Sequence, residues 1–115
     1  MRKNRSVIHH IALYVEDIKK ETRLFEQAFG MSITEIDGNP ENPKQVWLDG
    51  GIQLIAEPRE KGCAIAHLAL TTAEPEENLP VCREYGGETL PKGDNWLGFP
   101  DGLVLELILQ KTEEP

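Results

Sequence analysis

Hydrophobic and polar residues alternate along the first segment of the chain, from Val7 to Val15. The strongly apolar side chains lie at the odd positions, whereas the even positions are mixed. Alternation with a period of two, rich in β-branched residues, is typical of a strand with one face on a core. The odd face should therefore pack on the core, and His10 should lie on the opposite face. By the same alternation His9 falls on the core side, and we interpret it as structural or half-exposed.

The next pattern predicts an amphipathic helix. Asp17 is a suitable N-cap, and Gly30 is a suitable residue to end the helix. The apolar residues between them are spaced for one stripe and are Ile18, Leu24, Phe25, Ala28 and Phe29. A short strand over 32–36, a loop with two Asn-Pro pairs, and a hairpin of strands 45–48 and 52–56 should follow. The first half therefore reads β-α-β-β-β.

The second half of the chain repeats this order. The stretch His67-Leu-Ala-Leu70 echoes His10-Ile-Ala-Leu13, and each histidine precedes a helix-ending glycine, Gly30 or Gly87, by twenty residues. Strands are expected over 64–71, 88–90, 95–99 and 103–109, with a short or irregular helix within 76–85 that starts near Pro80. The sequence thus predicts an α+β domain built from two βαβββ modules, about 7–57 and 63–109.

A carboxylate stands in the last predicted strand, which is apolar on both sides. Four leucines, at positions 103, 105, 107 and 109, should occupy one face, so Glu106 lies on the other. A buried charge needs a partner, and either a metal ion or a nearby Arg or Lys would serve. Gln53 holds the equivalent position in the first half.

The repeat therefore offers His10 and Gln53 from one module, and His67 and Glu106 from the other. A single histidine in a strand is usually an ordinary core or surface residue, but two at matching positions of a repeat favour a shared role. Two imidazoles, one carboxylate and an amide oxygen form a plausible octahedral or tetragonal metal site with positions left for water or substrate.

Composition limits the possible partners. The 115-residue chain has a net charge of −8, which argues against nucleic acid, because phosphate binding needs a basic face. No stretch approaches the roughly 18 apolar residues of a membrane span, and no signal peptide is expected. The two cysteines, Cys63 and Cys82, have no CxxC spacing, so free thiols in a reducing cytoplasm are expected.

With these motifs the chain resembles the vicinal oxygen chelate superfamily. This superfamily includes glyoxalase I, methylmalonyl-CoA epimerase, fosfomycin-resistance enzymes, extradiol dioxygenases and bleomycin-resistance proteins. The resemblance extends from Ile8 to Ile108. The motifs that carry it are His10-Ile-Ala-Leu-Tyr-Val-Glu-Asp17, Phe25-Glu-Gln-Ala-Phe-Gly-Met31, His67-Leu-Ala-Leu70 and Pro100-Asp-Gly-Leu-Val-Leu-Glu106. It implies a cup-shaped mixed sheet with helices on the outer face. It also implies a homodimer.

The resemblance implies that His10, Gln53, His67 and Glu106 bind a divalent ion such as Ni, Zn, Mn or Fe. A small substrate would chelate the ion through two of its oxygens, and Glu106 would move a proton, as in a glyoxalase I-like lyase or isomerase. Gln53 departs from the glutamate of bacterial glyoxalase I and of the epimerase, which puts two-base isomerisation in doubt. A site of three ligands without Gln53 is an alternative, and Glu57 is a weaker substitute for it.

Aromatic residues could shape a substrate pocket. Tyr14 shares the face of His10, and Trp96 lies near a predicted strand end, so both are candidate substrate-binding residues. Three basic residues could bind an anionic substrate, although solvated loops are their ordinary role: Arg59, Lys61 and Lys92. Two other functions fit the resemblance. One is a metal-free module that sequesters a cationic aromatic drug with Trp47 and Trp96, and the other is a small dioxygenase.

Overall fold

The structure, a computed structural model, describes residues 5–58 and 64–110. The described chain divides into two compact units. The N-terminal module comprises His10–Ala66, and the C-terminal module comprises residues 67–110 together with residues 5–9. Among the described residues, neither helix is both long and apolar enough to cross a membrane. Cys82 is a free thiol, whereas Cys63, Arg59 and Lys61 lie outside the described residues.

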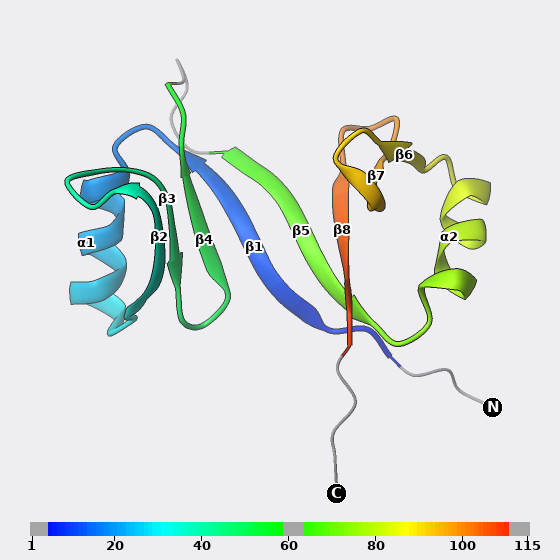
Figure 1. The fold of residues 1–115 in the computed structure, drawn as a ribbon, viewed down its shortest axis with the longest axis horizontal. Helices are drawn as coiled ribbons and strands as arrows, with labels where there is room; N and C mark the ends of the chain where they lie inside the picture. The colour runs from blue at the N-terminus through cyan, green and yellow to red at the C-terminus, as the bar shows by residue number, and fades with distance from the viewer. Residues whose placement is uncertain (1–4, 59–63, 111–115) are drawn as a thin grey trace, which may run out of the picture. The chain divides into compact units, whose positions relative to one another are not determined.

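The N-terminal module consists of one helix and a four-stranded mixed sheet (Figure 1). Its elements are β1 (Ile8–Val15, whose first two residues group with the other module), α1 (Ile18–Phe29), β2 (Ile33–Asn39), β3 (Asn42–Leu48) and β4 (Ile52–Ala56). The strand order is β2-β3-β4-β1. β1 runs parallel to β4, and the other neighbours are antiparallel.

The C-terminal module has the same set of elements, one helix and four strands. Its elements are β5 (Ala64–Thr72, whose first three residues group with the N-terminal module), α2 (Pro75–Glu84), β6 (Glu88–Leu90), β7 (Gly93–Gly98) and β8 (Val104–Leu109). The order is β6-β7-β8-β5, with β5 parallel to β8. The Thr71 amide donates to the Val7 carbonyl (2.9 Å), which ties the start of the chain to this module. The predicted α+β class with two βαβββ modules is confirmed.

The duplication extends to the pairing of individual residues. Five partner pairs join β1 to β4, from Ile11 with Ile52 to Val15 with Ala56. Adding 57 to each β1 residue and 53 to each β4 residue gives the five pairs that join β5 to β8. Because side chains alternate between the faces of a strand, equal register places equivalent residues on equivalent faces. The two modules therefore present matching faces.

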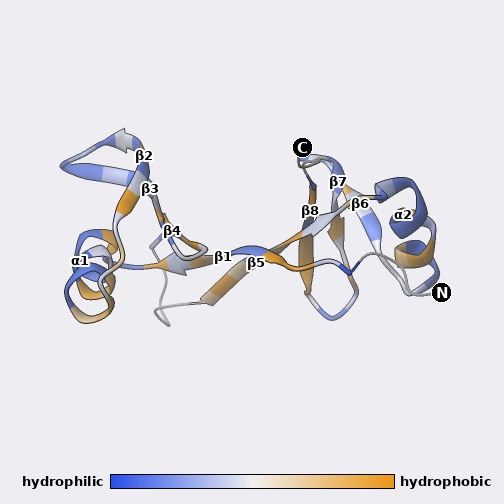
Figure 2. Cartoon of the chain, turned by 90° about the horizontal axis from the view of Figure 1, so that it is seen from below, coloured by the Kyte–Doolittle hydropathy of each residue, from blue (hydrophilic) through white to orange (hydrophobic). Residues whose placement is uncertain are grey.

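The core of the N-terminal module lies between α1 and its sheet. The buried residues that form it are Val15, Ile18, Val46, Leu48 and Leu54. The Asp17 carboxylate accepts a hydrogen bond from the Lys20 amide (3.1 Å) and so caps α1, while Gly30 ends the helix at a positive φ of 71°. Polar and apolar residues alternate around α1 in Figure 2, as expected of a helix with one buried face.

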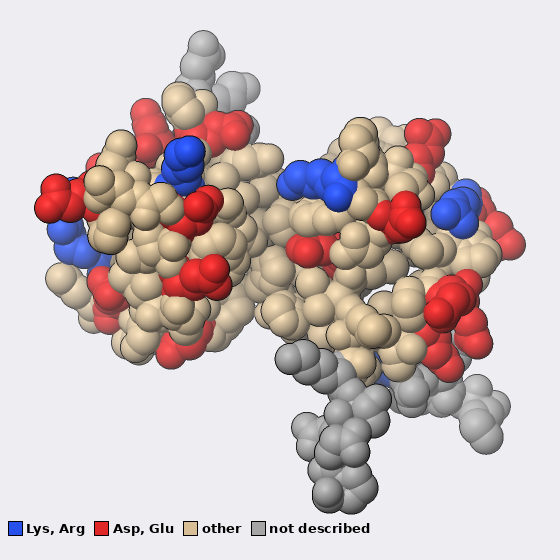
Figure 3. All heavy atoms as spheres, viewed as in Figure 1, with Lys and Arg blue, Asp and Glu red and all other residues tan. Residues whose placement is uncertain are grey.

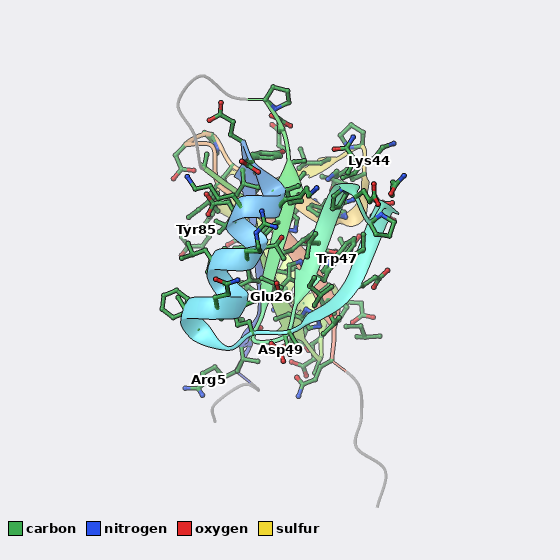
Figure 4. All side chains as sticks on the ribbon, turned by 90° about the vertical axis from the view of Figure 1, so that its left-hand side faces the viewer. Arg5, Glu26, Lys44, Trp47, Asp49 and Tyr85 are labelled. Carbon is green, nitrogen blue, oxygen red and sulfur yellow. The ribbon has the colours of Figure 1, made fainter. Side chains whose placement is uncertain are left out.

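A turn fixes the end of this sheet. Asp49, labelled in Figure 4 together with Trp47 of β3, lies between β3 and β4, and its carboxylate accepts from the Ser32 amide (2.9 Å). Val46, Leu48 and Leu54 point toward α1. The intervening residues Trp47 and Gln53, which are register partners, therefore lie on the opposite face.

Part of the predicted helix stripe is wrong. Ile18 and Thr22 are buried and Phe25 packs on the core, but Leu24 is half exposed. Leu24 lies about 120° around the helix from Ile18, so it cannot share the same contact face. Phe29 is 65% exposed and rests its ring on Phe25 instead, with centroids 6.1 Å apart.

Two element boundaries also differ from the prediction. The region of the Asn-Pro pairs is a tight connection rather than a loop, because β2 extends to Asn39 and β3 begins at Asn42. The Asn39 side chain accepts from the Glu41 amide (2.8 Å), which holds the turn. α2 begins at Pro75 and continues through Pro80. A proline at the first helical position is favourable, and an interior proline in so short a helix removes a single hydrogen bond.

The four-leucine face of the last strand is only partly buried. Leu107 is buried, but Leu103 is 43% exposed and Leu109 is 65% exposed. Leu103 precedes β8 and Leu109 is its last residue, so neither lies at the centre of the sheet. The alternation itself is correct: Leu105 and Leu107 pair with Leu68 and Leu70 on one face, and Glu106 pairs with Ala69 on the other face.

Candidate functional site

The C-terminal module brings two predicted site residues into contact. His67 on β5 lies two positions before Ala69, the register partner of Glu106 on β8. Both side chains therefore point from the same face, and His67 Nε2 lies 3.2 Å from Glu106 Oε1. His67 is buried and Glu106 is 17% exposed. These are residue types that can hold a metal ion, so the predicted pairing of this histidine with this carboxylate occurs within one module.

The environment of Glu106 favours its protonated form. Burial raises the pKa of the Glu106 carboxyl above its ordinary value, while the charges of Lys92 and His9 act in the opposite direction and lower this pKa less. A carboxyl group with a raised pKa exchanges its proton nearer to neutrality, which suits proton transfer. His9 was predicted to lie on the core side as a structural or half-exposed residue, but it is exposed, and its charge acts on Glu106.

Trp96 lies against this pair. It is the register partner of Glu106 across β7 and β8. Its ring meets the His67 ring in a T-shaped contact with centroids 4.6 Å apart, and Lys92 Nζ lies 4.3 Å above its centroid. The ring thus limits the orientation of the imidazole. Trp96, a predicted substrate-binding residue, adjoins the His67–Glu106 pair.

The N-terminal module carries the equivalent set on the equivalent face. His10 lies two positions before Ala12, the register partner of Gln53 on β4. Tyr14, the other predicted substrate-binding residue, pairs with Ile55 and shares this face. Gln53 is 6% exposed, whereas His10 and Tyr14 are half-buried. Glu57 lies beyond the end of β4 and is exposed.

The register also relates two tryptophans that the sequence pattern did not connect. Trp47 pairs with Gln53, as Trp96 pairs with Glu106. Each module therefore presents a histidine, an oxygen-bearing side chain and a tryptophan at corresponding places. The number of residues between the tryptophan and its partner differs in the two hairpins, so the constant spacing that revealed the histidines could not reveal the tryptophans. The signal that would have found them is hairpin register.

The donor atoms on these faces fit a divalent ion. Each face offers one imidazole and one side chain with a carbonyl or carboxylate oxygen, a set that suits zinc, nickel, manganese or iron. In addition, Gln53 uses its amide Nε2 to donate to Gln45 (2.5 Å). Within the described ranges 5–58 and 64–110, the Gln53 oxygen accepts no hydrogen bond. A buried amide oxygen of this kind gains from a cation.

A hollow on the surface of the N-terminal module lies elsewhere. A cavity of about 580 Å³ is bordered by the start of α1, together with Asn42 and Ala56. None of the predicted site residues lines it. The candidate site is therefore assigned to the histidine-bearing faces and not to this cavity.

The visible face in Figure 3 carries acidic side chains on both modules, in accord with the net charge of −8.

Comparisons with known proteins identify the fold. No protein-family model matches the chain. No curated protein matches it either. A hypothetical protein from Bacillus halodurans C-125 is similar in structure, with a TM-score of 0.67 and 16% identity, over 97% of this chain and 99% of that one. A methylmalonyl-CoA epimerase from Streptomyces coelicolor, in complex with 2-nitronate-propionyl-CoA, has a TM-score of 0.64 and 21% identity, over 95% and 98% of the two chains.

The 2,3-dioxygenase LapB from Pseudomonas sp. KL28 is also similar, with a TM-score of 0.64 and 17% identity. The match covers 91% of this chain and 42% of that one. The chain shares its fold with this epimerase and this dioxygenase. At these identities the likeness establishes the fold alone, and it spans two different reactions.

Proposed function

We propose that this chain is a metal-dependent enzyme of the vicinal oxygen chelate type, with a divalent ion held by His10, His67, Glu106 and Gln53. The observation that carries the proposal is the duplicated register, which gives each module an imidazole and an oxygen donor on corresponding faces. The close approach of His67 to Glu106 supports it. When bound, such an ion binds two oxygens of a small oxygen-rich substrate and stabilises negative charge that develops on them.

The chain's own residues would orient the substrate and move a proton. Glu106 is the proposed proton carrier, because it is the one carboxylate among the four proposed ligands. Trp96 and Tyr14 are proposed to contact the substrate. With one carboxylate and one amide among the four proposed ligands, a glyoxalase I-like lyase or isomerase that relies on Glu106 is the favoured reaction class. A small dioxygenase is the alternative within the same fold.

Metal binding is the direct test. The chelator-treated protein should take up about one Mn²⁺, Ni²⁺ or Zn²⁺ per chain in a calorimetric titration. His67→Ala and His10→Ala should each weaken binding by more than the roughly 10- to 100-fold that loss of an outer-sphere partner costs. His9→Ala is the matched control, since it removes the neighbouring exposed imidazole and should leave one ion bound. A wild-type protein that takes up none of these ions contradicts the proposal.

The reaction class can be tested separately from metal binding. A panel of small α-hydroxy ketones, hemithioacetals and 2-methyl thioesters incubated in D₂O should reveal exchange of the acidic C–H by NMR. Glu106→Gln should abolish this exchange. Exchange that persists in Glu106→Gln would assign proton transfer to another group. Oxygen consumption with catechols, and no C–H exchange, would instead favour the dioxygenase.

A metal-free drug-binding module is the second candidate, and the contact above Trp96 disfavours it. Lys92 already occupies a face of this ring. A cationic aromatic drug would have to displace a cation from the surface on which it should stack. Quenching of tryptophan fluorescence by a cationic glycopeptide at micromolar concentration, equal with and without metal, would favour this candidate over the enzyme.

The resemblance to vicinal oxygen chelate proteins also bears on the oligomeric state and on the partners of the chain. We propose a cytoplasmic homodimer that acts on a small molecule, without nucleic acid or membrane partners. The net charge of −8 supports the exclusion of nucleic acid. Light scattering at micromolar protein should give twice the mass of one chain, and the mass of a single chain would contradict the dimer.

A further inference from the structure

A chain of hydrogen bonds leads from the surface of the N-terminal module to Gln53. Gln45 Nε2 donates to Asp37 Oδ2 at 3.0 Å, and Gln53 Nε2 donates to Gln45 Oε1 at 2.5 Å. The three residues belong to neighbouring strands, because Asp37 pairs with Gln45 across β2 and β3, and β3 pairs with β4. Asp37 is exposed, Gln45 is half-buried and Gln53 is buried. The chain therefore runs from solvent to interior.

The carboxylate at the outer end gives this chain a direction. A carboxylate has only acceptor atoms, so Gln45 must turn its NH₂ group toward Asp37. Gln45 then presents its oxygen to Gln53, and Gln53 must turn its own NH₂ group toward Gln45. The order removes the ambiguity between nitrogen and oxygen that an isolated amide leaves open. The remaining acceptor of Gln53 is its Oε1.

We infer that Asp37 and Gln45 are positioning residues that fix the Gln53 amide with its oxygen available to a divalent cation. An amide can ligate a metal through its oxygen, whereas its NH₂ group repels a cation. A buried amide free to flip would present the wrong atom part of the time. This inference rests on the proposed metal centre. It explains how an uncharged residue could act as a ligand at the position that Glu106 holds in the other module.

The structural alternative is that the same bonds merely stabilise the β2–β3–β4 strands. Two single substitutions separate the positioning role from the structural role. Each of them raises the net charge of the protein by one, so the two variants can be compared directly. Asp37→Asn removes the fixed direction, since its amide can donate or accept. Gln45→Lys reverses the direction, because the new ammonium pairs with Asp37 and donates to Gln53, so that the Gln53 oxygen turns away from the metal. The ion pair with Asp37 should keep the fold stable.

A double substitution supplies the rescue. Asp37→Asn combined with Gln45→Glu moves the carboxylate one residue inward and restores the original net charge of the three residues. The new glutamate can only accept, so Gln53 again donates its NH₂ group and keeps its oxygen available. The double variant should therefore bind metal like the wild type, although both of its outer hydrogen-bonding partners have changed.

The test is calorimetric Mn²⁺ affinity, together with the visible spectrum of the Co²⁺-loaded protein, which reports coordination number. Gln45→Lys should bind about 10- to 100-fold more weakly, with a changed Co²⁺ spectrum. Asp37→Asn should be intermediate, and the double variant should match the wild type. Melting temperatures should not follow this order. Equal affinities for Gln45→Lys and the double variant would overturn the inference while leaving the metal centre intact. No ion in the wild type would overturn both.

Discussion

The two modules share a backbone plan but differ in what their helices do. α1 is capped by the Asp17 side chain and contributes Ile18 to a buried core. α2 has no side-chain cap, contains Pro80 and buries none of its residues. A cavity of about 270 Å³ lies beside it, lined by Leu79, Leu107 and others. Equal strand register therefore does not require equal packing. The N-terminal module has the more completely packed core.

The modules also differ in the charge of the oxygen-bearing side chain that each one buries, Gln53 or Glu106. The well-packed N-terminal module carries the neutral Gln53, and the loosely packed C-terminal module carries Glu106, whose pKa is raised by burial. A buried carboxylate costs free energy that an amide avoids. The C-terminal module therefore combines the looser packing with the greater electrostatic cost. We expect it to be the less stable half of the chain.

The largest expected effect comes from truncating matched core leucines. Leu54→Ala should lower the free energy of unfolding by about 2–5 kcal/mol, because this side chain is fully buried and leaves a cavity. Leu107→Ala, at the equivalent position, should cost less, since Leu107 already lines a cavity. Urea denaturation gives both values. Equal losses would show that the two cores are equally well packed and would contradict the comparison.

A smaller effect is expected at the start of each helix. Asp17→Ala should cost about 0.5–2 kcal/mol, because it removes the acceptor of the Lys20 amide. Glu74→Ala is the matched substitution before α2, where no side-chain cap exists, and should change stability little. Thermal unfolding followed by circular dichroism compares them. A loss at Glu74 as large as that at Asp17 would mean that α2 depends on its first turn as α1 does.

The smallest effect concerns pH. The pKa of Glu106 is raised above its ordinary value of 4.5 in the folded protein, so the folded state holds this proton more tightly than the unfolded state. Stability of the metal-free protein should therefore fall as pH rises from 4.5 through the raised pKa. Glu106→Gln should remove this slope and raise the melting temperature above that window by roughly 4 °C or less.

Melting curves of the metal-free protein between about pH 4 and pH 8 measure this contribution. The control is Glu88→Gln, which removes an exposed carboxylate from the same module. A wild-type curve that rises across the window while Glu106→Gln stays level would reverse the sign and contradict the raised pKa. Metal affinity should show the opposite trend and increase with pH, because the proposed ligand is the deprotonated carboxylate.

Much of the fold could be predicted because its signals are local. Alternation identified β1 and β5, the Asp17 and Gly30 pair bracketed α1, and the twenty-residue spacing after each histidine revealed the repeat. The errors have tertiary causes. Phe29 has the apolar character of a core residue but rests on Phe25 at the end of α1. The start of α2 was misplaced because Pro80 is tolerated within a short helix.

The sequence by itself determined the duplicated order of strands and helices, and it placed His10, Gln53, His67 and Glu106 on the sides of their strands that face away from the core. Period-two alternation is enough for this, because it depends only on neighbours in the chain. Tertiary structure alone decided the contact between His67 and Glu106, the raised pKa, the matching of Trp47 with Trp96 and the orientation of Gln53. These features depend on pairing between strands far apart in sequence, which fixes register, burial and hydrogen-bond direction.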